Sequence, residues 1–208
     1  MAAGPTAYQF EFSGGAVCLD FANTLGDRPR GRQEHLAAWT DLVAWGEQAG
    51  LLSARAARAL RAQYAARPGP AGRALARALD LRECLYRVFH AQAAGEAPAA
   101  ADLDRLNAWL AAAMPHARLE RQDGTYRWGW TAGDPSIDRL LWPVVRSAAD
   151  LVVSDERASV RECASDTCSW LFIDRSRTKR RRWCSMTTCG NRAKARRFYQ
   201  RQVGGSRT

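Results

Sequence analysis

The chain has 208 residues, of which 47% are hydrophobic and 25% are charged, and its formal net charge is +10. This length accommodates one or two domains with a sizeable core, and no run of about eighteen apolar residues is present to span a bilayer. A membrane protein is therefore excluded, and the positive charge indicates a polyanionic partner.

The charge is concentrated in one part of the chain. Residues 1–159 hold 18 basic and 18 acidic side chains, whereas residues 160–208 hold 13 basic and 3 acidic ones. The whole net charge therefore lies in the last 49 residues. We expect a neutral domain over residues 1–157 and a small basic domain over residues 158–208.

The N-terminus shows no basic segment followed by an apolar run, so a secretory signal is not expected and the cytoplasm is the predicted location. Tyr8, Phe10 and Phe12 alternate with polar residues, which predicts a strand. Gly14 and Gly15 then predict a turn into the next segment, which covers residues 16–21.

Apolar residues at helical spacing predict the following elements of the neutral domain. Ser53 is expected to cap one helix. The predicted helices cover residues 34–48, 54–66, 71–93 and 100–114.

A hairpin is predicted over residues 119–130 because Asp123-Gly124 is a typical tight-turn pair. Asp134-Pro135 then predicts the start of a long helix over residues 136–154, kinked at Pro143. The sum is an α+β fold whose N-terminal domain is mostly helical with a small antiparallel sheet.

The neutral domain carries no phosphate-binding glycine loop, nucleophile elbow or histidine-rich metal motif, so an enzyme is not expected. One polar group, Asp20, Asn23 and Arg28, stands among apolar residues. Asp20 and Asn23 either satisfy backbone groups at the end of a strand or line a pocket, together with Arg28, for a small polar ligand.

Four cysteines form two matched pairs in the basic domain, Cys163-x4-Cys168 and Cys184-x4-Cys189. Two such pairs, fifteen residues apart, predict one structural zinc ion with four thiolate ligands. Two disulfides are the alternative, disfavoured in a chain without a secretory signal. Cys18 and Cys84 are interpreted as reduced core residues.

A segment of 49 residues buries too little apolar surface to fold alone, and structural zinc supplies roughly 10 to 16 kcal/mol in small peptides. Residues 169–174 and 180–183 predict a β-hairpin with a basic tip. A helix is predicted from Gly190 to about Val203, with Ala195, Phe198 and Tyr199 packed on the hairpin.

The tail resembles the CGNR zinc-finger family, on the motif Cys189-Gly190-Asn191-Arg192 and the runs 161–174 and 182–186. Residues 12–24 and 42–52 resemble the start of the ABATE domain that precedes this finger in the family. The resemblance implies a treble-clef-like finger and a bacterial, stress-linked transcription regulator with a sensory N-terminal domain.

DNA binding is the favoured function, because basic side chains on the hairpin tip and on one helix face neutralise phosphates. Asn191 and Arg192 are expected to brace the zinc site through hydrogen bonds. The neutral domain, residues 1–157 and called the body below, is expected to sense a small ligand or to form a homodimer. The candidate nucleic-acid-binding residues are Arg175, Arg177, Lys179, Arg180, Arg181, Arg182, Lys194, Arg197 and Arg201.

Three alternatives remain open at this point. A basic zinc domain also suits structured RNA, for instance in a translation-associated protein. A basic protein-interaction domain is a further and less favoured alternative. An enzyme acting on nucleic acid is disfavoured, because four cysteine ligands leave zinc no open position for water.

Overall fold

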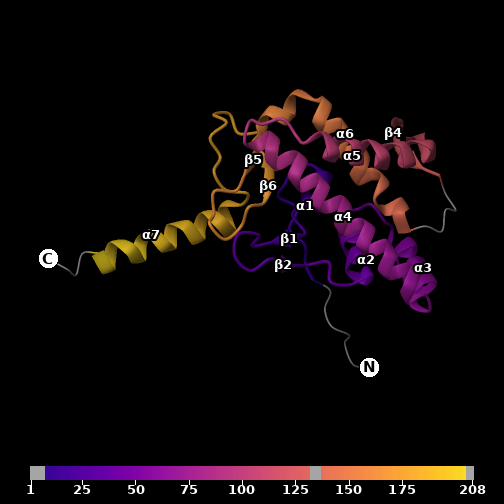
Figure 1. Ribbon diagram of the computed structural model, residues 1–208, viewed down its shortest axis with the longest axis horizontal. Helices are drawn as coiled ribbons and strands as arrows, with labels where there is room; N and C mark the ends of the chain where they lie inside the picture. Colours follow the sequence, from indigo (N-terminus) through magenta and orange to yellow (C-terminus); the bar gives the residue numbers. More distant parts are fainter. Residues whose placement is uncertain (1–7, 132–136, 205–208) are drawn as a thin grey trace.

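The structure is a computed structural model that describes residues 8–131 and 137–204, without the side chains of residues 137 and 201–204. Helices dominate it, and the strands form two-stranded antiparallel sheets. In Figure 1 the long helix α4 crosses the molecule, and α7 extends away from it. The α-helices are α1 (Val17–Ala22), α2 (Trp39–Gln48), α3 (Ala54–Ala65), α4 (Pro68–Ala93), α5 (Ala100–Ala113), α6 (Trp142–Val153) and α7 (Asn191–Gly204). The strands are β1 (Leu25–Gly26), β2 (Gln33–Glu34), β3 (Ala117–Gln122), β4 (Thr125–Trp130), β5 (Val160–Glu162) and β6 (Leu171–Ile173).

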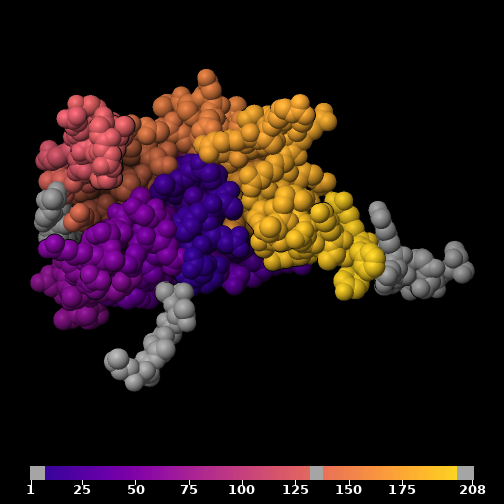
Figure 2. All heavy atoms as spheres, turned by 180° about the vertical axis from the view of Figure 1, so that it is seen from behind, coloured from indigo at the N-terminus to yellow at the C-terminus, as the bar shows by residue number. Residues whose placement is uncertain are grey.

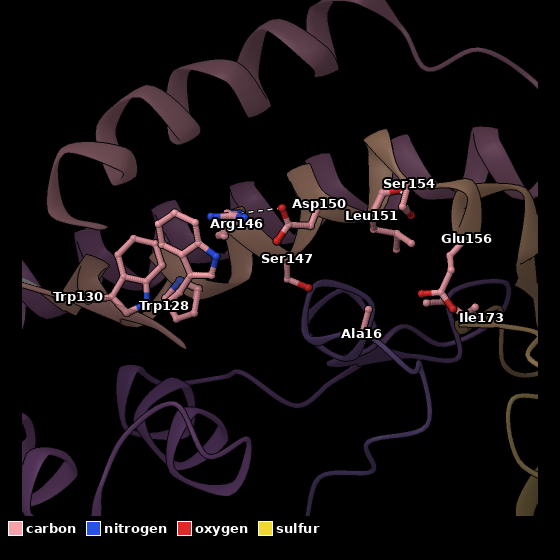
Figure 3. Close-up of a pocket in the computed structure, with 11 residues that line it drawn as sticks. Ala16, Trp128, Trp130, Arg146, Ser147, Asp150, Leu151, Ser154, Glu156 and Ile173 are labelled. Atoms are coloured by element: carbon pink, nitrogen blue, oxygen red, sulfur yellow. Dashed lines mark hydrogen bonds and ion pairs between the residues drawn. The ribbon is translucent and has the colours of Figure 1, made fainter. Parts of the chain in front are cut away.

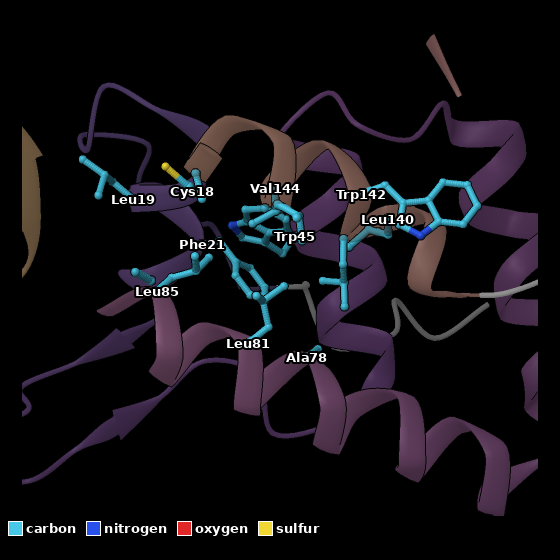
Figure 4. Packing of buried hydrophobic residues seen from close by; sticks show 14 of the residues in the cluster. Cys18, Leu19, Phe21, Trp45, Ala78, Leu81, Leu85, Leu140, Trp142 and Val144 are labelled. Carbon is cyan, nitrogen blue, oxygen red and sulfur yellow. The ribbon is translucent and has the colours of Figure 1, made fainter. Parts of the chain in front are cut away.

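The main core surrounds α1, which packs against both α4 and α6. Leu19 and Phe21 on this short helix are fully buried, and Phe21 lies against the Trp45 ring of α2 at 4.9 Å between centroids. Figure 4 shows Phe21 and Trp45 between Leu81 of α4 and Val144 of α6. The predicted reduced cysteines Cys18 and Cys84 are buried in the same core and are not disulfide-bonded.

The predicted helices of the body are confirmed with small changes at their ends. The Ser53 side chain accepts a hydrogen bond from the Ala56 N–H and caps α3 as expected. Helix α4 begins three residues earlier than predicted, at Pro68, whose fixed φ suits a first helical turn. None of the helices in the described ranges has the length and apolar character to cross a membrane.

The helix predicted from Glu34 begins only at Trp39. Asp41 accepts a hydrogen bond from the Ala38 N–H at 2.8 Å and so fixes the first turn there. Glu34 instead lies in β2, where its carboxylate receives two hydrogen bonds from Arg82. The apolar pattern at helical spacing extends back to Glu34, but the ion pair with Arg82 holds Glu34 in an extended strand.

The strand predicted from Tyr8 to Phe12 is wrong, because residues 8–13 pair with no other strand in the described chain. The Gln48 side chain satisfies their backbone instead. It accepts from the Phe10 N–H at 2.9 Å and donates to the Tyr8 carbonyl at 2.8 Å. The alternation therefore reflects one buried ring, Phe10, in an extended segment.

The hairpin predicted around Asp123-Gly124 is confirmed as β3 and β4, with Gln122 opposite Thr125. The long helix predicted after it is divided in two. A 3-10 turn covers Ile137–Leu140, and Pro143 stands in the first turn of α6 rather than at a kink. Asp134, Pro135 and Ser136, predicted to open this helix, lie outside the described residues.

The hairpin predicted within the tail is also wrong. Strand β6 pairs with β5, which precedes the first cysteine, with Val160 opposite Ile173 and Glu162 opposite Leu171. The segment after β6 is folded around the buried Asp174, whose carboxylate accepts from the N–H groups of Ser176 and Arg181, both at 2.9 Å. A side-chain acceptor thus replaces the expected partner strand.

Strand β6 joins the tail to the body. Leu171 and Ile173 are buried in the main core, whereas Phe172 between them is buried in a second cluster with the four paired cysteines. This follows from the alternation of side chains along a strand. Asn23, after α1, donates to the Leu171 carbonyl at 2.9 Å and accepts from the Leu171 N–H at 2.8 Å.

We expect Asn23→Ala to lower the free energy of unfolding by about 2 to 4 kcal/mol, because it removes two buried hydrogen bonds and leaves the Leu171 backbone unpaired. Chemical denaturation monitored by circular dichroism measures this loss. Asn107→Ala on the exposed face of α5 is the matched control, with an expected change within about 0.5 kcal/mol. Equal losses in both variants would contradict the role given to Asn23.

Candidate metal centre and nucleic-acid interface

The four paired cysteines converge on one point. Their sulfur atoms all lie within 4.8 Å of one another and all four side chains are buried. The Cys168 and Cys184 sulfurs are 3.6 Å apart, and those of Cys184 and Cys189 are 3.7 Å apart. Four ligands at the Zn–S distance of ~2.3 Å on a tetrahedron are about 3.8 Å apart, so the cluster fits zinc and excludes S–S bonds of ~2.05 Å.

Local backbone structure places each sulfur. Cys163 directly follows β5, and its N–H donates to the Trp170 carbonyl at 2.8 Å. Cys168 ends a turn in which its N–H donates to the Ser165 carbonyl. Cys189 lies in a π-helical turn, Met186–Gly190, that Ser185 caps before α7 begins.

The shifted pKa values of the four thiols are consistent with a bound cation. Hydrogen bonding from the Cys168 and Cys184 sulfurs lowers the pKa of the Cys163 thiol. Hydrogen bonding to Cys163 in turn raises the pKa values of Cys168 and Cys184, and burial raises that of Cys189. A divalent ion is what allows four such close sulfurs to be deprotonated together. The cluster is a structural zinc site, with its four protein ligands complete.

Asn191 and Arg192 make the kind of contact expected of braces. The Asn191 side chain donates to the Thr187 carbonyl at 3.1 Å, within the turn that holds Cys189. Arg192 donates to the Thr167 hydroxyl at 3.0 Å, beside Cys168. Each therefore ties the start of α7 to one cysteine pair.

The structure divides the predicted nucleic-acid-binding residues into two groups. Several are engaged inside the protein: Arg175 pairs with Glu156 at 2.6 Å, Lys179 donates to the Asp174 carbonyl, and Arg181 donates to the carbonyls of Trp183 and Cys184. Among the predicted residues whose side chains the structure describes, those that are exposed and make neither such a contact nor a cation–π contact are Arg177, Arg180, Lys194 and Arg197. The side chain of Arg201 lies outside the described residues.

A cleft of about 230 Å³ lies between the zinc-binding segment and α7. Four of its lining residues are arginines, and the Arg182 guanidinium lies over the Trp183 ring, 5.2 Å from its centroid. Asp166, the acid in this lining, is already paired with Arg196 and with Arg30 of the body. The lining side chains that carry the chemistry are Arg182, Trp183, Arg192, Arg196 and Arg197.

The sequence interpretation missed Trp183 and Arg196 as parts of this cleft. An aromatic residue next to a run of arginines was the available signal. The expected packing of Phe198 and Tyr199 on the finger is wrong, since these rings are 58% and 66% exposed on α7. Figure 1 shows the reason, because α7 leaves the zinc site pointing away from the body and meets no facing element.

The structure does not bring Asp20, Asn23 and Arg28 into one pocket. Asp20 accepts from the Gly14 N–H at 2.8 Å, and Asn23 holds Leu171 as described. Arg28 pairs with Glu83 and lies over the Tyr86 ring at 3.7 Å from its centroid. Asp20 and Asn23 satisfy backbone groups, as the first alternative predicted, although they do so in and after a helix rather than at a strand.

A groove of about 400 Å³ runs along α6 from β4 to β6. Figure 3 shows Trp128 and Trp130 at one end and Glu156 and Ile173 at the other. Its charged groups are paired within the protein. The Arg146 Nε atom forms an ion pair with Asp150 Oδ1 at 2.8 Å, and its guanidinium carbon lies 4.0 Å from the centroid of the Trp128 ring. The groove therefore offers few unsatisfied groups to a ligand.

Two family models together cover most of the chain. Residues 15–155 match ABATE, whose description is "Putative stress-induced transcription regulator". Residues 159–202 match the CGNR zinc finger. Both resemblances stated from the sequence are thereby confirmed. No curated protein matches the chain.

We expect the purified protein to hold one zinc ion per chain. Cys184→Ser should lose most of it, because oxygen is a poorer ligand for zinc than thiolate. Cys84→Ser, a buried cysteine outside the cluster, should retain the full amount. Native mass spectrometry measures both ratios, and full zinc content in the Cys184 variant would contradict the assignment.

Zinc removal should act on the tail unevenly. After chelation, hydrogen exchange is expected to accelerate by orders of magnitude in residues 175–200, which depend on the zinc cluster. Leu171 and Ile173 should stay protected, since the body core and Asn23 hold them. Complete loss of protection in β6 would show that the metal supports this strand as well.

Burial raises the pKa of Asp20 to about 6. Its folded pKa lies above its unfolded value of ~3.9, so the native state binds the extra proton and this group's contribution to stability falls as the pH rises from 4 to 7. We expect Asp20→Asn to be more stable relative to the wild type at pH 7 than at pH 4, by roughly 2 to 3 kcal/mol. Urea denaturation at the two pH values tests this, and a constant difference would contradict it.

Proposed function

We propose that this chain, which belongs to the ABATE family and carries a CGNR zinc finger, is a zinc-dependent DNA-binding transcription regulator. In this proposal residues 158–208 bind DNA, and residues 1–157 sense a small ligand or mediate homodimer formation. The observation that carries it is the surface of unpaired cations on the finger and on the projecting helix α7.

The finger's own acidic groups do not offset these cations at the surface. Glu162 lies beside His90 and the Tyr86 hydroxyl, at 3.2 and 3.3 Å. Asp174 is buried and accepts backbone N–H groups. Asp166 is shared between two arginines. Arg177, Arg180, Lys194 and Arg197 are thus left to attract phosphates.

The shape of the finger favours DNA over RNA. Helix α7 has 14 residues, about 21 Å at 1.5 Å per residue, and stands clear of the body. The major groove of B-DNA, ~12 Å wide, admits such a helix, whereas the major groove of A-form RNA is too narrow. The basic cleft at the start of α7 would then hold a backbone phosphate.

Single-stranded nucleic acid, RNA included, is the second candidate. The exposed Phe198 and Tyr199 rings on α7 favour it, because unpaired bases stack on such rings. Competition between duplex DNA, single-stranded DNA and folded RNA at one salt concentration ranks the three. Strongest competition by either of the last two would move the assignment to the second candidate.

The remaining parts of the proposal are a cytoplasmic location and the absence of enzymatic activity. Six free cysteines suit a reducing compartment. A zinc ion with four cysteine ligands has no open position at which to activate water. Reproducible turnover of a nucleic-acid substrate by the purified protein would refute this part.

About six phosphate contacts predict that log K for duplex DNA falls with log[salt] at a slope of roughly −5. Arg177→Gln combined with Arg197→Gln should weaken binding at least 10-fold and reduce the steepness of the slope by about 2, because each lost phosphate contact removes close to one released ion. Fluorescence anisotropy with labelled DNA at several salt concentrations measures both quantities.

Arg55→Gln combined with Arg58→Gln on the exposed face of α3 is the matched control, since it removes two positive charges from the body. Its affinity and slope should equal those of the wild type. A wild-type slope near zero would remove nucleic acid from the proposal altogether.

A further inference from the structure

Another cavity, called the seam cavity below, lies at the boundary between the body and the zinc site. It has a volume of about 220 Å³. Figure 2 shows the indigo N-terminal segment packed directly against the yellow C-terminal one. One wall includes Tyr8, Glu11, Asp27 and His35, and the other includes Trp170 and three of the four zinc-binding cysteines.

Two polar atoms in this lining are buried and have no hydrogen-bond partner among the described residues. They are Oδ1 of Asp27 and Nε1 of Trp170. One is an acceptor and the other a donor, and leaving such a group unpaired costs about 1 to 3 kcal/mol. A molecule in the cavity that pairs with both atoms, water included, removes this cost.

The backbone at Asp27 adds to this cost. Its φ of 45° lies in the left-handed region, which non-glycine residues rarely adopt. Its carbonyl accepts the N–H groups of Arg30, Gly31 and Arg32, so the following loop is wrapped around it. The structure therefore holds the carboxylate at the cavity at a conformational cost, as is common at binding sites.

The charges around the cavity select the ligand. Glu11 and Asp27 supply two negative charges, and Arg192 supplies one positive charge that is already directed at Thr167. A zinc ion with four thiolates carries a further net charge of −2. The cavity thus disfavours phosphates and favours a cation, and Tyr8 and His35, stacked at 4.1 Å, line its aromatic side.

The other candidate sites lack this combination. In the groove along α6 the charged groups are paired with one another. The cavity beside Asp20 and Asn23 has no room for a ligand. The cationic cleft at α7 belongs to the proposed nucleic-acid interface.

We propose that the seam cavity binds a small organic cation that also carries a hydroxyl or carbonyl oxygen. Its ammonium group donates to Asp27, and its oxygen accepts from the Trp170 indole N–H. The class is that of amino alcohols and other short amines with one oxygen function. Because Arg192 and three of the cysteines line the same cavity, an occupant touches the base of α7.

The regulatory consequence rests on the proposed function, whereas the binding itself does not. If the finger binds DNA, occupancy of the cavity should change that affinity. If DNA binding fails, the cavity is still expected to bind the cation in the zinc-loaded protein.

Three probes of equal length separate charge from shape: 5-aminopentanol, 1,5-pentanediol and 5-hydroxypentanoate. We expect only the amine to shift the indole N–H signal of Trp170 in nitrogen–proton NMR spectra of the full-length, zinc-loaded protein. Trp170→Phe identifies that signal among those of the eight tryptophans. No shift with the amine, or an equal shift with the diol, would overturn the proposal.

Asp27→Asn should weaken binding of 5-aminopentanol at least 10-fold, since it removes the charge while asparagine tolerates the same backbone conformation. Asp123→Asn is the matched control, because Asp123 has a φ of 49° in the β3–β4 turn, outside the cavity lining. Its affinity should equal that of the wild type. Unchanged affinity in the Asp27 variant, or equal losses in both, would refute the site.

Discussion

The arrangement of this protein depends on one three-residue strand whose two faces belong to two different cores. Leu171 and Ile173 of β6 complete the body core, while Phe172 completes the cluster around the zinc ligands. Both edges of the strand form hydrogen bonds. One edge pairs with β5, and at the other Leu171 bonds to the Asn23 side chain. The finger is consequently anchored to the body through a shared strand, and the two are not joined by a flexible linker.

The shared strand changes what the metal has to stabilise. Taken alone, 49 residues appear to need zinc for all of their structure. In the folded chain the body already supports β5 and β6, and the zinc holds the remaining turns, the π-helical turn and the start of α7. The repulsion among the finger's arginines is reduced at one point in the same way, because Glu156 of the body pairs with Arg175 of the finger.

Local signals in the sequence predicted what depends on local structure. The Ser53 cap, the Asp123-Gly124 turn, the body helices and the cysteine pairs are each specified within a few residues. The errors concern partners that are distant in sequence or missing. Gln48 replaces a strand for Tyr8 and Phe10, β5 replaces the expected second strand of the tail hairpin, and nothing in the described chain covers Phe198 and Tyr199. An alternating or amphipathic pattern shows that a face is apolar and does not identify what packs on it.

Residues 8–35 contact the finger at several points. Asn23 holds β6, Arg30 pairs with Asp166, which also holds Arg196 on α7, and Asp27 faces the zinc cluster across the seam cavity. Helix α4 also contacts β5 and β6 directly. A change in the body can therefore reach the zinc-binding turns through this segment, through β5 or through β6. A ligand in the seam would act directly on the segment, whereas one in the groove along α6 would have to displace the buried β6.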